Sequence, residues 1–315
     1  MTRVAAIDCG TNSIRLLIAD VDTAGPAPRL NDVVREMRVV RLGQGVDATG
    51  ELSREALDRT FAAAGDYAEQ IRRHAATKVR FVATSATRDA RNRQVFVDGI
   101  RGLLAVEPEV ISGDSEAALS FAGASSVLPS RGADPVLVVD LGGGSTEFVL
   151  GNAGGVIAAR SVDIGCVRLT ERHLRSDPPT AAEIAAAEAD VDAALDEAAG
   201  AVPLDQTAAV VGVAGSITTI TAHALALDEY SSAAIHGTEL SLDVIRRACT
   251  ELLEMSRADR AVLPYMHPGR VDVIGAGALV WRRALDRLAA VTQGRVGTAV
   301  TSEHDILDGI ALSIS

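Results

Sequence analysis

The sequence predicts an α/β protein made of two related halves. The chain has 315 residues, about twice the size of an ordinary domain, so two domains of roughly 150 residues each are expected. Apolar segments typical of buried strands alternate along the chain with segments of helical periodicity. A short pattern near the N-terminus also returns later in the chain, which indicates an internal repeat at the scale of a domain.

The repeated pattern is an apolar strand, an Asp, a turn of small residues and a second apolar strand. It occurs at residues 4–20 and again at residues 136–151. Three positions match at a common offset of 132 residues, namely Asp8 with Asp140, Gly10 with Gly142, and Ser13 with Ser145. Such a repeat favours two α/β halves that face each other and offer the same turn to a shared cleft.

The first half alternates strands and helices after its opening hairpin. Ser53 begins a helix whose apolar positions step by four, three, four and three residues, namely Leu57, Phe61, Ala64, Ala68 and Ile71, which predicts one buried stripe. The other expected elements are strands at 35–43, 79–86 and 106–112 and helices at 88–105 and 114–128.

Pro, Gly, Ser and Asp are concentrated at residues 128–135, which predicts a domain boundary there. The expected domains are therefore 1–128 and 129–315. In the second, Thr180 and Glu183 form a capping box before a helix that Gly200 is expected to end. Residues 208–225 follow as a strand, a tight turn and a helix, and a final helix at 303–315 is expected to pack back on the first domain.

The composition excludes several classes of protein. With 48% hydrophobic and 23% charged residues, the chain is typical of globular proteins. No apolar run reaches the ~18 to 20 residues of a membrane span, and no signal peptide is visible, so we expect a cytoplasmic protein without a membrane partner. A net charge of -12 argues against binding nucleic acid. The three cysteines are far apart in the sequence, which excludes a disulfide framework and favours buried thiols.

The two turns have the chemistry of phosphate binding. Small residues let successive backbone N–H groups point into one concavity, and such a nest holds phosphate oxygens without net positive charge. Four hydroxyls can donate further hydrogen bonds, those of Thr11, Ser13, Ser145 and Thr146. Asp8 and Asp140 are hard oxygen ligands suited to Mg²⁺ shared with phosphate. A single glycine-rich hairpin is usually only a hairpin, whereas two, each led by Asp, favour a function.

Two nucleotide-binding motifs can be set aside. The Walker pattern GxxxxGK[ST] is absent, and each turn is followed by a strand rather than a helix. Residues 271–280 begin like a dinucleotide fingerprint, but Val280 stands where a third Gly or Ala is needed. The apolar spacing of this segment predicts instead a helix in which Gly275 and Gly277 permit close packing.

Five motifs together resemble the exopolyphosphatase and guanosine pentaphosphate phosphohydrolase (Ppx/GppA) family, closest to its short actinobacterial members. They are DCGTNSIRL (8–16), ATSATRDARN (83–92), ISGDSEA (111–117), DLGGGSTE (140–147) and MHPGRVDVIGAG (266–277). The resemblance implies two similar actin-like domains, ribonuclease H-like as in acetate and sugar kinases, Hsp70 and actin, with an interdomain cleft. Ala214 and Ser216 stand where relatives often have Gly and Thr.

The resemblance also implies roles for individual residues. Glu116 would act as general base, and Asp140, Asp8 and Glu147 would hold Mg²⁺. The phosphate-binding residues would be those of the two turns, namely Gly10, Thr11, Asn12 and Ser13 in the first and Gly142, Gly143, Gly144, Ser145 and Thr146 in the second. Arg88 and Arg270 are candidates for gripping further phosphates, because guanidinium groups match phosphate oxygens.

The sequence therefore predicts a Mg²⁺-dependent exopolyphosphatase that releases orthophosphate from the ends of inorganic polyphosphate. The same chemistry on guanosine pentaphosphate stays open, because both substrates end in a phosphoanhydride. A phosphotransferase and a non-catalytic actin-like sensor are alternatives of other classes, and the SGDSEA motif argues against both. A homodimer is expected from the resemblance alone.

Overall fold

The computed structural model describes residues 2–25, 28–124 and 134–314. The chain forms two compact units, one of Met1–Gly123 with Ile306–Ser315 and the other of Ala124–Asp305. The boundary expected between residues 128 and 129 lies outside the described residues. A cleft between the two halves stays a prediction from the sequence.

The sheet of the first unit has the strand order β3-β2-β1-β4-β5. Its strands are β1 (Thr2–Cys9), β2 (Ser13–Asp22), β3 (Arg29–Val39), β4 (Lys78–Ala83) and β5 (Glu109–Val110). The first three form an antiparallel meander, while β4 runs parallel to β1 and β5 parallel to β4. The carboxyl ends of β1, β4 and β5 therefore meet at one edge of the sheet.

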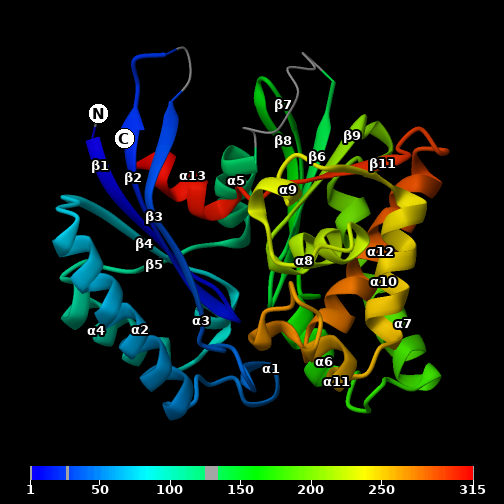
Figure 1. The fold of residues 1–315 in the computed structure, drawn as a ribbon, viewed down its shortest axis with the longest axis horizontal. Coiled ribbons are helices and arrows are strands. Elements are labelled where there is room, and N and C mark those ends of the chain that lie inside the picture. Colours follow the sequence, from blue (N-terminus) through cyan, green and yellow to red (C-terminus); the bar gives the residue numbers. More distant parts are fainter. Residues whose placement is uncertain (1, 26–27, 125–133, 315) are drawn as a thin grey trace. The chain divides into compact units, whose positions relative to one another are not determined.

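Helices cover both faces of this sheet (Figure 1). They are α1 (Val46–Thr49), α2 (Arg54–Arg73), α3 (Ser85–Asp89), α4 (Arg93–Leu104), α5 (Gly113–Ala124) and the C-terminal α13 (Ile306–Ser313). The helices α2 and α4 pack on one face, and Ser53 caps α2 by accepting a hydrogen bond from Ala56 N, as the sequence predicts. The opposite face of β1 and β2 is covered by α13.

The last helix is held in the first unit by specific contacts. Asp308 is buried and accepts two hydrogen bonds from the guanidinium of Arg35 on β3, at 3.1 and 2.6 Å. Gly309 lies so close to α5 that a Cβ there would be 1.9 Å from the carbonyl oxygen of Leu119. The end of the chain therefore completes the core of the first unit.

The second unit repeats the same topology in the order β10-β11-β9-β6-β7-β8. Its strands are β6 (Val136–Leu141), β7 (Thr146–Asn152), β8 (Gly155–Val162), β9 (Ala209–Val213), β10 (Glu239–Ser241) and β11 (Thr298–Thr301). The meander β6-β7-β8 is again antiparallel, and β9 runs parallel to β6 as β4 does to β1. The predicted fold class, two similar α/β halves, is confirmed.

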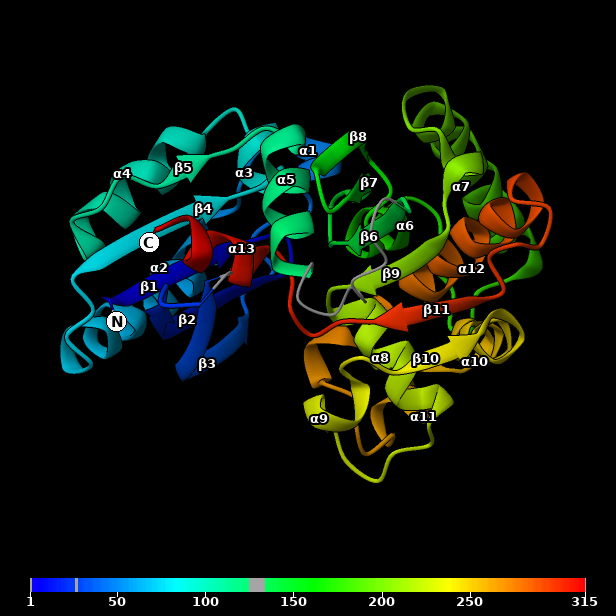
Figure 2. The ribbon, with the colours of Figure 1, turned by 90° about the horizontal axis from the view of Figure 1, so that it is seen from above.

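Most of the remaining helices pack around one large core in this unit. The remaining helices are α6 (Cys166–Arg172), α7 (Ala181–Ala201), α8 (Gly215–Ala224), α9 (Ser232–Ile235), α10 (Leu242–Glu254), α11 (Arg257–Ala261) and α12 (Ile274–Val291), with the 3-10 turns η2 (Leu204–Gln206) and η3 (Pro268–Arg270). Figure 2 shows α7 and α12 side by side. The predicted helix around Gly275 and Gly277 is confirmed, and both glycines make close contacts, with Arg260 and Ser216.

Two further local predictions are confirmed. The capping box of Thr180 and Glu183 is present at the start of α7. All three cysteines are free and buried. The described part of the chain contains no helix whose length and hydropathy would let it span a bilayer.

Several element boundaries differ from the prediction. Gly200 does not end α7, which continues to Ala201, because the chain becomes extended only at Val202, the residue before a proline. The strand expected at 79–86 ends at Ala83, since its partner β1 ends at Cys9 and offers no further pairing. The strand expected at 106–112 is reduced to the two residues of β5.

The helix expected at 88–105 is two helices, α3 and α4. They are separated because Ala90 is extended and because the side chain of Asn92 exchanges two hydrogen bonds with the backbone of Leu52. The strand expected at 35–43 is β3, which ends at Val39. Residues 40–43 leave the sheet because the N–H groups of Val40, Arg41 and Gly43 bond to the first turn.

Candidate functional site

The second turn, Gly142–Ser145, joins β6 to β7. It is closed by a hydrogen bond from Gly142 N to Ser145 O at 3.1 Å. The chain that follows β8 passes under this turn and begins α6 at Cys166. Three successive carbonyls of the turn accept hydrogen bonds from that segment, those of Gly142 from Cys166 N at 3.0 Å, of Gly143 from Val167 N at 2.8 Å, and of Gly144 from Gly165 N at 3.2 Å.

These bonds determine where the N–H groups of the turn point. In a planar trans peptide the C=O and the N–H of the next residue point in opposite directions. Since the three carbonyls face the start of α6, the N–H groups of Gly143, Gly144 and Ser145 face away from it. Within residues 2–25, 28–124 and 134–314, no acceptor takes any of these three N–H groups. The turn therefore presents a row of N–H donors on the side away from α6, an arrangement that suits an anion such as phosphate.

Glycine at position 165 is required for this arrangement. A Cβ there would lie 2.3 Å from both the carbonyl carbon of Gly143 and the nitrogen of Gly144. Both atoms belong to the backbone of the turn, so no side chain can move aside to make room. The contact holds the turn and the start of α6 at a backbone-to-backbone distance that only glycine permits.

The side chains beside this turn make specific contacts. Asp140 and Glu147 are directly opposite each other on β6 and β7, and both are buried. Glu147 accepts a hydrogen bond from the hydroxyl of Ser161 on β8, at 2.7 Å. The hydroxyl of Thr146 donates to the carbonyl of Ile164 at 3.1 Å. This hydroxyl, which was expected to donate to phosphate, therefore donates within the unit instead.

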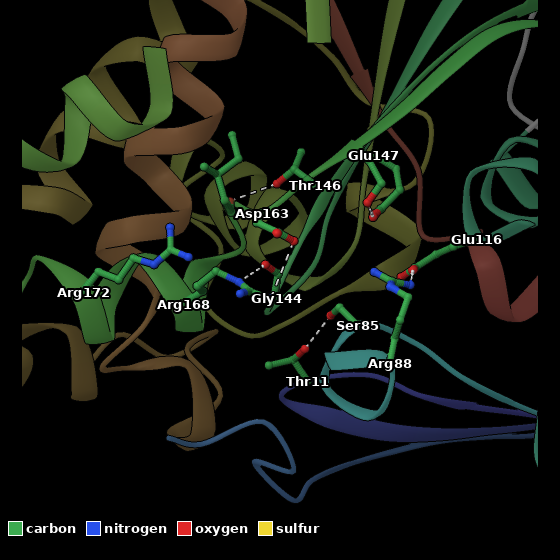
Figure 3. Close-up of polar contacts among 12 residues, drawn as sticks. Thr11, Ser85, Arg88, Glu116, Gly144, Thr146, Glu147, Asp163, Arg168 and Arg172 are labelled. Atoms are coloured by element: carbon green, nitrogen blue, oxygen red, sulfur yellow. Dashed lines mark hydrogen bonds and ion pairs between the residues drawn. The ribbon is translucent and has the colours of Figure 1, made fainter. Parts of the chain in front are cut away.

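The first turn, Gly10–Ser13, is closed in the same way, by Gly10 N donating to Ser13 O at 2.9 Å. Its carbonyls bond to the chain that follows β3. Thr11 O accepts from Gly43 N at 2.8 Å, and Asn12 O accepts from Val40 N at 3.0 Å and Arg41 N at 2.8 Å. The hydroxyl of Thr11 is hydrogen-bonded to that of Ser85 at the start of α3, at 2.8 Å (Figure 3).

Glu116 and Arg88 meet at the edge of the first sheet where β4 and β5 end. Arg88 belongs to α3, which follows β4, and Glu116 to the first turn of α5, which follows β5. Arg88 Nη1 donates to Glu116 Oε2 and to the carbonyl of Ile111, both at 3.1 Å. The carboxylate is buried, so this charge-assisted bond holds it in one orientation. Arg88, predicted to grip phosphate, is thus paired with the predicted base.

Asp8 and Arg270, two further predicted site residues, are also engaged with protein groups. Asp8 Oδ2 accepts hydrogen bonds from Arg15 Nε at 2.9 Å and Arg15 Nη2 at 2.7 Å. Arg270 Nη1 donates to the hydroxyl of Thr219 at 3.0 Å, and its guanidinium packs on Gly215.

Cys166 lies under the second turn but is a poor nucleophile. Its burial raises the pKa of the thiol, and this effect outweighs the lowering by the hydroxyl of Ser216 and by the charge of Arg270. Burial, followed by the same Arg270 charge, lowers the pKa of His267. His267 accepts a hydrogen bond from Gly269 N at 3.0 Å and so shapes its turn, in agreement with a structural role. Cys166 therefore provides no thiolate near neutral pH.

The carboxylates suit a divalent cation only in part. Asp140 and Glu147 fit, because two hard oxygen ligands on one hairpin, beside a phosphate turn, are a set that Mg²⁺ accepts. Asp8 fits less well, since Arg15 already balances its charge. In the part of the chain that the structure describes, no three His, Cys, Asp or Glu side chains form a complete ion site. Phosphate oxygens and water would have to supply the remaining ligands.

Sequence reasoning missed three side chains that support these residues: Arg15, Ser85 and Ser161. Only Arg15 had a usable signal, because in a hairpin with the four-residue turn Gly10–Ser13 the seventh residue after Asp8 lies opposite it. Ser161 could not be found, since the pairing of β7 with β8 is interrupted by a register shift at Leu150 and Gly151.

Comparison with known proteins gives a consistent result. Residues 17–313 match the model of the Ppx/GppA phosphatase family. The chain is 52% identical to "Exopolyphosphatase 2" of Mycobacterium tuberculosis, over 100% of this chain and 99% of that protein. A crystal structure of an exopolyphosphatase-like protein superimposes with a TM-score of 0.94 at 47% identity, covering 99% of this chain and 97% of the other.

A further relative has a different name. The chain is 35% identical to the "Guanosine-5'-triphosphate,3'-diphosphate pyrophosphatase" of Photobacterium profundum. This likeness covers 63% of the chain and 37% of that protein. It therefore concerns a smaller part of both proteins than the likeness to the mycobacterial protein.

Proposed function

Since this chain belongs to the Ppx/GppA phosphatase family, we propose that it is an exopolyphosphatase, a hydrolase that releases orthophosphate from the end of inorganic polyphosphate. The full-length likeness to a protein named exopolyphosphatase carries this proposal. Two features at the edges of the sheets support the proposal, a glycine turn with outward N–H groups and a buried carboxylate.

The chemistry asks mainly for positioning and neutralisation of charge, because the transition state of phosphoryl transfer is loose. We assign the N–H groups of Gly143, Gly144 and Ser145 to the oxygens of the terminal phosphate. Glu116 orients the attacking water and accepts its proton, and Arg88 keeps that carboxylate in place. A carboxylate offers about four lone-pair sites, so a carboxylate that accepts from a guanidinium can also accept from water.

We propose Mg²⁺ as the cofactor, held by Asp140 and Glu147, with Asp8 as the third predicted ligand. When bound, the ion neutralises charge on the phosphate oxygens. The bond from Ser161 to Glu147 orients that carboxylate, which is a common arrangement behind a metal ligand. Cytoplasmic location and assembly as a homodimer belong to this proposal as well, and sedimentation velocity would check the latter.

A second candidate is hydrolysis of guanosine pentaphosphate, favoured by the likeness to the Photobacterium pyrophosphatase. Both substrates present a terminal phosphoanhydride, so the assigned residues would perform the same steps on either. The two substrates differ in what is attached beyond the terminal phosphates. The preference of the enzyme between them is measured as the ratio of their kcat/KM values.

The test is release of orthophosphate, with Mg²⁺, from short polyphosphate, long polyphosphate, guanosine pentaphosphate and ATP in parallel. Glu116→Gln is the blank and is expected to lower kcat by about 100-fold or more, since neutralisation removes the proton acceptor. The matched control is Asp114→Asn, an exposed carboxylate in the same first turn of α5, which is expected to leave kcat unchanged.

The outcomes separate the candidates. Release from polyphosphate that Glu116→Gln abolishes would support the exopolyphosphatase, and a higher kcat/KM with guanosine pentaphosphate would favour the second candidate. Equal activity of Glu116→Gln and the wild type would remove Glu116 from the mechanism. No release from any of the four substrates would contradict hydrolysis.

A further inference from the structure

The carbonyl of Gly144 is held by a charged side chain as well as by the backbone. Arg168 Nε donates to Gly144 O at 2.7 Å, whereas Gly165 N donates to the same oxygen at 3.2 Å. The backbone N–H of Arg168 donates in addition to Gly143 O, at 3.2 Å. One residue of α6 therefore contacts two successive peptides of the turn, and Figure 3 shows its guanidinium beside Gly144.

The side chain of Arg168 is itself held in place. Only 12% of it is exposed, and Nη2 lies 3.6 Å from Oδ1 of Asp163, whose side chain is 66% exposed. The guanidinium thus lies between an exposed carboxylate and the carbonyl of the turn, and its hydrogen bond goes to the turn. A charged donor to a carbonyl at 2.7 Å is a stronger bond than a backbone N–H at 3.2 Å.

Glycine makes this restraint necessary. The peptide between Gly144 and Ser145 is preceded by three glycines, and glycine adopts positive and negative φ with similar ease. A rotation of that peptide would direct the carbonyl of Gly144 into the nest and the N–H of Ser145 toward α6. An acceptor would then replace a donor in the nest. A phosphate oxygen would then meet a carbonyl oxygen and be repelled.

We propose that Arg168 is a positioning residue for phosphate binding, which acts by holding the Gly144–Ser145 peptide with its N–H directed into the nest. It does not contact the substrate in this role, and its charge also polarises the peptide so that the N–H becomes a better donor. This inference rests on the proposed function of the turn as the phosphate site and goes beyond it by assigning the residue that orients it.

Arg172 provides a matched control. It lies one helical turn further along α6, and its side chain is 32% exposed. Its Nη1 donates to Asp190 Oδ2 at 3.1 Å, away from the turn (Figure 3). The variants Arg168→Met and Arg172→Met remove the same guanidinium from the same helix, and only the first removes the bond to Gly144.

Kinetics with polyphosphate give the first readout. Arg168→Met is expected to raise KM by about 10-fold and to lower kcat/KM by about 10- to 100-fold, because a misplaced N–H group binds the substrate less well. Arg168→Lys should recover part of this loss, because an ammonium can still donate to Gly144 O. Arg172→Met should stay within about twofold of the wild type. A purely structural defect would instead lower kcat through loss of folded enzyme and leave KM unchanged.

Hydrogen exchange of the amides gives a second readout that needs no ligand and no activity. Arg168→Met is expected to speed exchange of the peptides covering residues 142–146 relative to Arg172→Met, with other regions unchanged. Equal exchange in the two variants would overturn the proposal, as would equal KM values. If the wild-type protein hydrolyses none of the substrates, the proposed function fails, and the exchange experiment still decides whether Arg168 orients the turn.

Discussion

The two turns are built on the same plan and are supported differently. In each unit, the chain that leaves the third strand of the meander passes under the turn between the first two strands and donates N–H groups to its carbonyls. In the first unit this chain is the loop of residues 40–43. In the second unit it leads directly into α6, and Arg168 adds a charged donor.

The difference shows which turn depends on its support. The first turn has a hydroxyl pair, Thr11 with Ser85, and only one glycine among its four residues. The second has three glycines, which leave the backbone mobile when nothing holds it. The turn with more freedom receives the more rigid support, namely a helix start, an arginine and the backbone contact of Gly165.

The largest effect is expected for Gly165→Ala. The new Cβ would meet backbone atoms of Gly143 and Gly144 at 2.3 Å, so the turn or α6 has to shift. We expect a loss of about 3 kcal/mol in the free energy of unfolding, at the upper end for overpacking, and a fall in kcat/KM of about 100-fold. Urea denaturation and the phosphate-release assay check both, and a stability near that of the wild type would contradict rigid support.

Replacement of Asp8 and of Asp140, the aspartates that precede the two turns, should affect Mg²⁺ activation and stability differently. Asp140→Asn is expected to raise the Mg²⁺ concentration for half-maximal activity by about 10-fold, because a charged oxygen ligand is lost. Asp8→Asn should change this concentration less and lower the stability instead, since Asp8 is bound to Arg15. A Mg²⁺ titration of both variants measures this. Equal shifts would show that the two aspartates contribute alike to metal binding.

A smaller effect is expected for Gly43→Ala, the counterpart of Gly165→Ala in the first unit. Here the new Cβ would meet the Cγ2 methyl of Thr11 at 2.3 Å, and a side chain can move where a backbone cannot. We expect a loss of about 1 kcal/mol.

The double variant with Thr11→Ser gives the control, because serine keeps the hydroxyl and lacks the methyl. It should recover most of the stability in urea denaturation. If it does not, the clash lies elsewhere, and Ala86 at 3.1 Å is the next neighbour.

The sequence predicted the features that both turns share better than the contacts that hold each turn in place. The repeated Asp, Gly and Ser, the strands beside them and the capping box of α7 depend on neighbours in the sequence, so local patterns were enough. Ser85 and Arg168 depend on which segment lies under which turn, and that follows from the packing of the whole meander. The residue roles assigned to Glu116, Asp140 and the turns stay predictions, which the variants above test.

The second unit also contains a carboxylate held by backbone N–H groups, which shows how such donors affect an anion. The carboxylate of Glu183 accepts hydrogen bonds from the N–H groups of Arg175, Ser176 and Thr180 at 3.2, 3.0 and 2.8 Å. The backbone N–H of Thr180 above all, then that of Ser176 and the hydroxyls of the same two residues, lower the pKa of Glu183 to about 2. Backbone N–H groups and hydroxyls thus favour a negative charge without any cation, and the N–H groups of Gly143, Gly144 and Ser145 would favour phosphate for the same reason.

This comparison yields the smallest predicted effect, a dependence of stability on pH. The pKa of Glu183 is lower in the folded chain than its ordinary value of 4.5, so its ionised form stabilises the fold above that pH and loses this contribution as the pH falls toward 2. Glu183→Gln should therefore be less stable than the wild type at pH 7, and the difference should shrink between pH 4.5 and 2. Urea denaturation across this range, with the exposed Glu69→Gln as control, measures it. A difference that stays constant would mean that the N–H groups do not discriminate charge, and the same reasoning for the phosphate turn would lose its support.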